Sequence, residues 1–180
     1  YVIQASSVDG YNHLSADKIF SDKTDTSNLN RFSFANNNYH NPNDNETDVY
    51  SLGGYDGDWI KIQFPESKAL QKLIIYIRTD LADRAPGVFK IFGSNNGSIW
   101  NEIHYQSTQL TTSSYLPLSG SGINYPFSSY HESIISYFEV NINNNTSYQH
   151  YALVVNKITG NDTRLDIVFL EFLMRQDYQL

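Results

Sequence analysis

The segment from Gly57 to Pro65, GDWIKIQFP, most constrains what this chain can fold into. Its apolar residues at positions 60, 62 and 64 alternate with polar residues at positions 61 and 63, which is the period of two of a strand with one buried face. Proline has no N–H to donate to a neighbouring strand, so we expect the strand to end before Pro65. The segment therefore predicts a half-buried β-strand over residues 59–64.

A second segment predicts a β-hairpin. Residues 88–92 and 99–105 are rich in aromatic and β-branched residues, and Asn95-Asn96-Gly97-Ser98 lies between them. Asn and Gly tolerate the positive φ angles that tight turns require. The two runs are therefore expected to pair through a short turn.

The rest of the chain also reads as short strands, because no stretch keeps a period of 3.6 over three helical turns. Residues 1–58 are polar and interrupted by turns, and residues 106–136 form a long segment of Ser, Thr, Gly and Tyr, of a length that is often functional. Several short strands with regular turns predict an all-β fold, an antiparallel β-sandwich. We expect strands over residues 59–64, 72–78, 88–93, 99–105, 136–142, 150–156 and 164–173.

Composition limits the size of the fold and the class of partner. A chain of 180 residues with 40% hydrophobic content can bury one core, so residues 1–180 are predicted to form one domain. The net charge is −7 and no cluster of Lys and Arg occurs, which argues against nucleic acid, whose binding depends on concentrated positive charge. The longest apolar runs, such as residues 167–170, have the length of strands, so we expect a soluble domain without a membrane span.

The order of these motifs resembles a known family. The strand at residues 59–64 is followed, after one more apolar strand, by a strand that closes on Gly93–Gly97 (GSNNG) with Trp100 three residues later. This arrangement resembles the discoidin-like, galactose-binding-like β-sandwich, a jelly roll that is called the coagulation-factor type C domain in animals and a carbohydrate-binding module in bacteria. The resemblance implies a domain that binds surfaces and sugars without breaking bonds.

Trp59 and Trp100 both lie at strand edges within this signature. Tryptophan has a large apolar surface and is usually well buried in folded proteins. We therefore expect both side chains to pack in the core, and not to stack on a ligand.

The resemblance also implies a structural Ca²⁺ site. Residues 16–26, ADKIFSDKTDT, are similar to the early family motif whose loop surrounds the ion, although the Asp-Gly pair of that motif is missing and Ser21 or Asp22 aligns with its aspartate. Calcium takes about six to eight oxygen ligands, which a turn dense in Asp and Thr can supply. The alternative is a solvated acidic turn. The predicted ligands are Asp22, Asp25, Thr26 and Glu171.

Glu171, which corresponds to the glutamate of the family's last strand, supports this site independently. It alternates with apolar residues at positions 165, 167, 169 and 173, which places its charge on an apolar face. An unpaired carboxylate is costly there, so something must compensate it. The alternative to a metal ion is a Lys, an Arg or a backbone N–H.

Sugar binding in such modules is expected from loops at one end of the sandwich. An aromatic ring stacks on the apolar face of a pyranose, and polar side chains bind its hydroxyls. The position of Arg78, at the end of the second strand, resembles that of the arginine that many galactose-binding members use. The candidate carbohydrate-binding residues are Asn38, Tyr39, His40, Arg78, Arg84, Tyr125, Phe127 and Asn161.

Catalysis is not expected. Glycoside hydrolysis needs two carboxylates that face each other across a cleft, and acidic residues near strand ends usually form turns. Those beside the first two strands are Asp56, Asp58, Asp80 and Asp83. The sequence has no Gly-x-Ser-x-Gly motif, no phosphate-binding glycine loop and no His-x-x-x-His zinc pattern.

The sequence therefore predicts a non-catalytic module that binds glycans on a cell surface. A single shallow sugar site binds with a Kd of about 1 mM, so display in several copies is expected. Two alternatives remain open. One is a membrane-surface module that inserts Ile123, Tyr125 and Phe127, which the net charge of −7 opposes on anionic lipid. The other is a structural or protein-interaction domain.

The expected location is extracellular, on a cell surface or on a virion. Animal discoidin domains commonly carry a disulfide, and this chain has no cysteine, which favours a bacterial, phage or viral version of the fold. The chain opens at Tyr1 with no signal-like segment, which is typical of a mature product or a piece of a longer protein. We expect the domain to serve attachment or adhesion.

Overall fold

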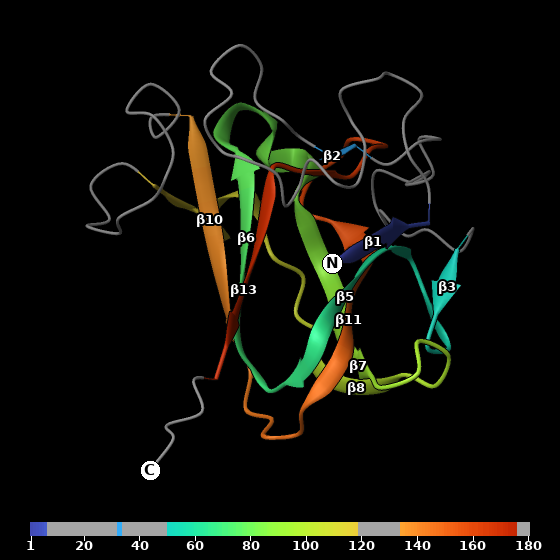
Figure 1. Cartoon of the computed structure of the whole chain (residues 1–180). Helices are drawn as coiled ribbons and strands as arrows, with labels where there is room; N and C mark the ends of the chain where they lie inside the picture. Colours follow the sequence, from blue (N-terminus) through green and yellow to red (C-terminus); the bar gives the residue numbers. More distant parts are fainter. Residues whose placement is uncertain (7–31, 34–49, 119–133, 176–180) are drawn as a thin grey trace.

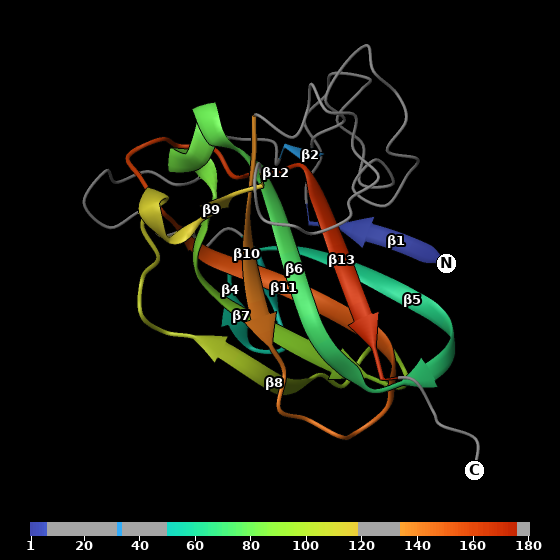
Figure 2. The ribbon, with the colours of Figure 1, turned by 90° about the vertical axis from the view of Figure 1, so that its left-hand side faces the viewer.

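Two antiparallel sheets face each other in the computed structural model, which describes residues 1–6, 32–33, 50–118 and 134–175 (Figure 1). The five-stranded sheet contains, in spatial order, β1 (Val2–Ala5), β5 (Asp58–Lys68), β11 (Tyr148–Ile158), β7 (Pro86–Ser94) and β8 (Asn101–Gln106). The four-stranded sheet contains β13 (Phe169–Met174), β6 (Leu70–Arg78), β10 (Ile135–Asn141) and β9 (Leu116–Pro117). Figure 2 shows this second layer in front of the first. The predicted all-β sandwich is confirmed.

Two short strand pairs form two further, separate sheets. They are β2 (Phe32–Ser33) with β12 (Asp166–Ile167), and β3 (Ser51–Leu52) with β4 (Tyr55–Asp56). The strand predicted over residues 164–173 is thus divided, because β12 pairs with β2 whereas β13 pairs with β6. No helix in the described part of the chain is long and apolar enough to cross a membrane.

The first strand continues past Pro65, so the expected end of this strand was wrong. β1 pairs with residues 60–63 only, and the register of β11 against β5 shifts between His150, which faces Gln63, and Tyr148, which faces Lys68. Pro65 lies in this irregular stretch, where a missing N–H costs no paired ladder bond. The proline is therefore tolerated inside β5.

The core lies between the two sheets. Period-two alternation turns Ile60 and Ile62 of β5 toward Leu73 and Ile75 of β6, and all four are at most 4% exposed. The two tryptophans, which were expected to pack in this core, lie outside it. Trp59 and Trp100 are half-buried on the outer face of the five-stranded sheet, against a small cluster of Leu52, Phe92, Ala152 and Val154.

The predicted hairpin between β7 and β8 is confirmed, and side chains hold its turn. Asn96 Oδ1 accepts hydrogen bonds from the N–H groups of Ser98 (2.9 Å) and Ile99 (2.8 Å). Ser94 Oγ accepts another from the N–H of Gly97 (3.0 Å), whose φ of 70° favours glycine. The turn thus explains residues 94–97 of the Gly-Ser-Asn-Asn-Gly run, whereas Gly93 lies in β7, where a Cβ atom would be 2.2 Å from the ring of Tyr148.

The chain crosses from one sheet to the other at a single residue. β5 ends at Lys68 and β6 begins at Leu70, so only Ala69 lies between them. The buried Tyr151 clamps this crossing, because its hydroxyl donates to the carbonyl of Lys68 and accepts from the N–H of Leu70 (3.1 Å). The two sheets are therefore fixed to each other at this corner.

Candidate functional site

Three candidate sugar-binding residues lie at the end of the sandwich where β6 finishes. Arg78 is the last residue of β6, and Arg84 is the last residue of the 3₁₀ helix η2 (Thr79–Arg84) that follows it. Asn161 is exposed in the loop between β11 and β12. We call η2 together with residues 159–166 the loop end.

Backbone hydrogen bonds hold η2 against its neighbours. The N–H of Thr79 donates to the carbonyl of Ile134 (2.9 Å), and the hydroxyls of Thr79 and Ser136 are 2.9 Å apart. These contacts tie the start of η2 to β10. η2 is therefore attached to the four-stranded sheet at its first residue.

The loop between β11 and β12 is fastened to η2 on the other side. The N–H of Gly160 donates to the carbonyl of Asp83 (3.0 Å), and the N–H of Thr159 donates to the carbonyl of Ala85 (2.9 Å). A Cβ atom on Gly160 would lie 2.4 Å from the Cβ of Asp83, so only glycine permits this approach. The loop and η2 form one unit that spans both sheets.

Arg84 is the charged centre of this unit. Its Nε donates to Asp162 Oδ2 (2.8 Å) and its Nη1 to Asp166 Oδ2 (3.2 Å). Arg84 is 20% exposed and Asp166 only 7% at the side chain. Burial lowers the pKa of Arg84, but its hydrogen bonds to the two carboxylates outweigh burial, so the pKa is raised overall. Arg84 is consequently held by structure and less available to a ligand.

Asp162 is ionised in this setting. Burial raises its pKa, but hydrogen bonds from Arg84 and from the N–H groups of Thr163 (2.7 Å) and Arg164 (3.1 Å) outweigh burial and lower the pKa overall. The carboxylate thus accepts hydrogen bonds and does not donate a proton near neutral pH.

Arg78 differs from Arg84 in exposure. Its guanidinium binds both carboxylate oxygens of Asp80, with Nε 2.8 Å from Oδ1, and the side chains are 29% and 55% exposed. The hydrogen bond to Asp80 raises the pKa of Arg78. An exposed ion pair contributes little to stability and can exchange partners. Arg78 can therefore present N–H donors to a ligand beside a carboxylate acceptor.

Glu171, the only predicted calcium ligand within the described residues, is half-buried on the outer face of the four-stranded sheet. It shares that face with Phe169, and its Oε2 accepts a hydrogen bond from the hydroxyl of Tyr76 (2.8 Å). A tyrosine hydroxyl therefore compensates the charge, a partner that the sequence did not suggest. The predicted alternation was wrong for Leu165 and Ile167, which lie in the main core because the chain changes partner strand between β12 and β13, and Leu173 is exposed. The described residues contain no cluster of three or more His, Cys, Asp or Glu that could hold a metal ion.

The remaining predicted site residues lie outside the described part of the chain. They are Asn38, Tyr39, His40, Tyr125 and Phe127 for sugar, and Asp22, Asp25 and Thr26 for calcium. Sequence reasoning missed the carboxylates that hold the arginines. Asp80, two residues after Arg78, could have been paired with it from spacing alone, whereas Asp162 and Asp166 are 78 and 82 residues from Arg84.

No family model matches the sequence, and no curated protein is similar to it in sequence. Solved structures are similar in fold. The module CpGH89CBM32-5 from Clostridium perfringens, solved with GalNAc-β-1,3-galactose, has a TM-score of 0.59 and 15% identity over 96% of this chain and 94% of that one. The family 32 carbohydrate-binding module of C. perfringens NanJ, solved with galactose, has a TM-score of 0.57 and 10% identity over 95% and 91%.

The fucolectin from the serum of striped bass, Morone saxatilis, is also similar, with a TM-score of 0.54 and 11% identity over 95% of this chain and 45% of that one. Identities this low show the fold and not the function. The chain thus has the galactose-binding-like β-sandwich fold of the family 32 carbohydrate-binding modules, which is the fold that its discoidin-like motifs predicted.

Proposed function

We propose that this domain is a non-catalytic carbohydrate-binding module that recognises glycans on a cell surface. The observation that carries the proposal is the fold, because more than nine-tenths of the chain aligns with modules solved with galactose and with GalNAc-β-1,3-galactose. The loop end supports it, since guanidinium donors and carboxylate acceptors of the kind that bind sugar hydroxyls lie within one hydrogen-bonded unit.

The proposed sugar site is the loop end. Arg78 donates to the sugar hydroxyls, Asn161 adds an exposed amide, and Arg84 orients the loop through Asp162. The aromatic surface for stacking comes from residues outside the described part. These are Tyr39, Tyr125 and Phe127, with Asn38 and His40 as further hydrogen-bonding groups.

The state of the carboxylates supports binding over hydrolysis. A glycosidase needs a carboxylic acid with a raised pKa, whereas the pKa of Asp162 is lowered. Asp80 pairs with Arg78, and the buried Asp58 accepts a hydrogen bond from the hydroxyl of Ser6 (2.8 Å). All three carboxylates thus accept hydrogen bonds from side chains of the protein itself.

The proposal extends to the setting of the domain. Weak single sites gain strength in arrays, so we propose that the module acts in several copies on an extracellular, cell-surface or virion-surface protein. Calcium bound by Asp22, Asp25, Thr26 and Glu171 would be structural. Saturating Ca²⁺ should then raise the Tm, and EDTA should reverse the rise, because an ion that binds only the folded state stabilises it.

A glycan array with the fluorescently labelled, clustered domain tests the function, once in Ca²⁺ and once in EDTA. Binding to a defined terminal sugar is expected, and Arg78→Ala should weaken it by roughly tenfold or more, the loss of one charge-assisted hydrogen bond. Lys72→Ala is the matched control, because Lys72 is also 29% exposed, lies on the same strand and forms one ion pair, with Glu139. A folded domain that binds no glycan in either buffer contradicts the proposal.

A further inference from the structure

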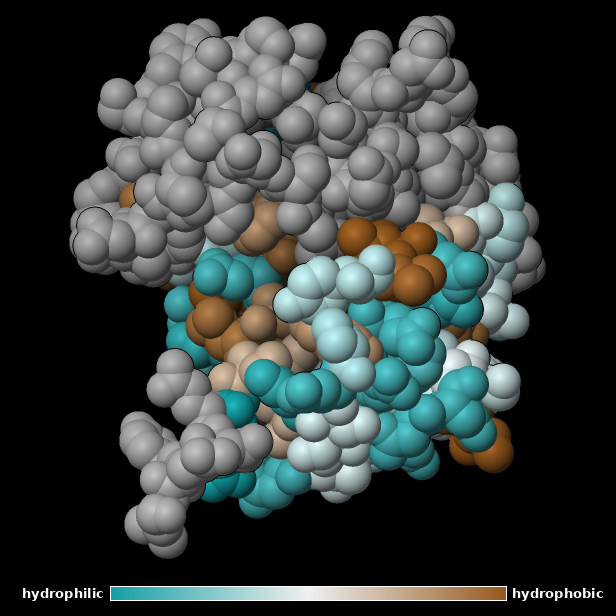
Figure 3. Space-filling view, viewed as in Figure 1, coloured by the Kyte–Doolittle hydropathy of each residue, from teal (hydrophilic) through white to brown (hydrophobic). Residues whose placement is uncertain are grey.

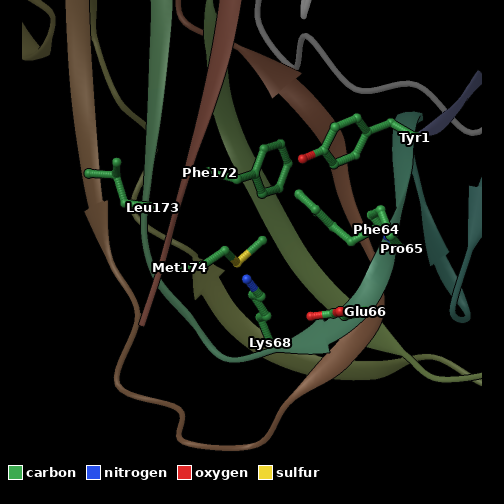
Figure 4. A pocket seen from close by; sticks show the side chains of 8 residues that line it. All are labelled: Tyr1, Phe64, Pro65, Glu66, Lys68, Phe172, Leu173 and Met174. Atoms are coloured by element: carbon green, nitrogen blue, oxygen red, sulfur yellow. The ribbon is translucent and has the colours of Figure 1, made fainter. Parts of the chain in front are cut away.

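A groove of about 420 Å³ opens along the side of the sandwich between β5 and β13 (Figure 4). It is lined by Tyr1, Phe64, Glu66, Lys68, Phe172 and Met174, among others. This volume falls within the range of about 300–1,000 Å³ that is typical of small-molecule sites. Apolar and hydrophilic surface lie next to each other on this face of the molecule (Figure 3).

Sheet topology creates the groove. β1 pairs with β5 only as far as Gln63, and β13 is the outermost strand of its sheet. From Phe64 onward, β5 therefore has no neighbour on this side within the described residues. The side chains of both strands line the gap between this stretch of β5 and β13.

The groove has one aromatic wall and one charged wall. The ring of Phe64 meets that of Tyr1 edge-on at 5.4 Å and that of Phe172 at 5.9 Å. Figure 4 shows these rings on one side and the Lys68 ammonium and Glu66 carboxylate on the other, with Met174 between. Both charged side chains are exposed, and neither forms an ion pair with another described residue.

We propose that this groove is a second carbohydrate subsite, which takes one or two pyranose units of a neutral glycan. The apolar face of the sugar lies against the aromatic wall, while its hydroxyls donate to Glu66 and accept from Lys68. An acyl chain would instead strip water from both charges without replacing their hydrogen bonds. The proposal rests on the proposed function, since it assumes that the domain binds glycans.

The subsite is separate from the loop end. Leu70 and Leu73 of β6 face Met174 and Phe172 of the groove in the strand register, whereas the loop end begins after Arg78. Five to eight strand residues separate the two places, which is roughly 17–26 Å. Two sites at this spacing on one domain can engage two branches or two neighbouring glycans, which raises avidity without any tighter single contact.

Amide chemical shifts of the ¹⁵N-labelled full chain test the subsite. Galactose and GalNAc-β-1,3-galactose are titrated separately to roughly 50 mM, well above a Kd of about 1 mM. We expect shifts at residues 64–68 and 172–174 that saturate with their own Kd, beside those at residues 78–84 and 159–166. The variant Glu66→Ala/Lys68→Ala should weaken the groove Kd about tenfold and leave the loop-end Kd unchanged.

Further variants and outcomes keep the two proposals apart. Phe172→Leu keeps apolar volume but removes a ring, so it should weaken the groove Kd alone, and Lys72→Ala should change neither Kd. Shifts confined to the loop end would overturn the subsite and leave the proposed function intact. Groove shifts with dodecylphosphocholine but with neither sugar would also overturn it. If neither sugar shifts any amide and the array is blank, both proposals fail.

Discussion

The two ends of β6 are stabilised in opposite ways. At its last residue, Arg78, the chain enters a unit built from ion pairs and backbone hydrogen bonds around Arg84. Near its first residue, Leu70, the neighbouring surface is a groove bordered by aromatic rings. A hydrogen-bonded ion pair requires a defined geometry between its two groups, whereas contacts between apolar rings tolerate rearrangement. The loop end is therefore the more ordered surface for hydrogen bonding, and the groove is the more adaptable one.

The largest loss of stability is expected for Arg84→Ala, at the loop end. The substitution removes the hydrogen bonds that the guanidinium donates to Asp162 and to Asp166, whose side chain is only 7% exposed. We expect the free energy of unfolding to fall by about 2–3 kcal/mol, with loss of glycan binding, as measured by urea unfolding and the glycan array. The control Lys72→Ala should cost less than about 1 kcal/mol. An equal loss in both variants would show that Arg84 is an ordinary surface cation.

The corresponding change in the groove is Phe172→Ala. The ring of Phe172 contacts those of Phe64 and Tyr151 at 5.9 and 6.3 Å and is half-buried. We expect a loss of about 2 kcal/mol in urea unfolding, less than for a fully buried phenylalanine. Phe172→Leu should recover at least half of it, because apolar contact matters more here than ring geometry. If Leu recovers nothing, the groove is as specific as the loop end.

Acid should weaken the loop end, because Asp162 is a carboxylate with a lowered pKa. The folded-state pKa of Asp162 lies below its ordinary value of 3.8, so the carboxylate stabilises the fold above about pH 3.8 and loses this effect as the pH falls through the folded pKa. We expect Asp162→Asn to lower stability by about 1 kcal/mol at pH 7 and by less at pH 3. Thermal unfolding of both proteins across this range measures the difference. A constant gap would mean that the charge of Asp162 has no role.

The smallest expected effect lies outside both ends, at His104 of β8. Its Nε2 is buried without a hydrogen-bond partner among the described residues, and burial lowers its pKa below 6.5. The folded state therefore disfavours the protonated ring, and stability should decline as the pH falls below about 6.5 toward the folded pKa. His104→Leu should flatten this slope in thermal unfolding. An unchanged slope would assign it to His150, whose pKa burial also lowers.

The strands and the hairpin could be predicted because their signals are local. Alternation over residues 59–64 and the Asn-Gly turn at residues 95–98 act within a few residues. Local signals also misled, since Pro65 does not end β5: its missing N–H falls where β5 has no paired partner. Trp59 and Trp100 do pack, but alternation places Trp59 on the outer face, opposite the core residues at 60 and 62.

The site was predictable only in part. The sequence named Arg78, at the end of a strand, and Arg84, before Pro86, as candidates, and the structure places both at one end of the sandwich. The partners of Arg84 come from a segment about 80 residues further on and are set by the sheet order. The groove had no sequence signal, because it arises where β1 stops pairing with β5 beside the edge strand β13. Tertiary pairing of this kind leaves no period in a single sequence.

The crossing at Ala69 has a mechanical consequence. One residue joins the two sheets there, and the hydroxyl of Tyr151 grips the chain on both sides of it, whereas seven residues from Thr79 to Ala85 make the next crossing from β6 to β7. The angle between the two sheets is therefore set at this corner, where a single side chain from the five-stranded sheet holds both residues that flank the turn. The second crossing reaches the same layer by a longer path and depends on η2 and its hydrogen bonds to residues 159 and 160 for closure.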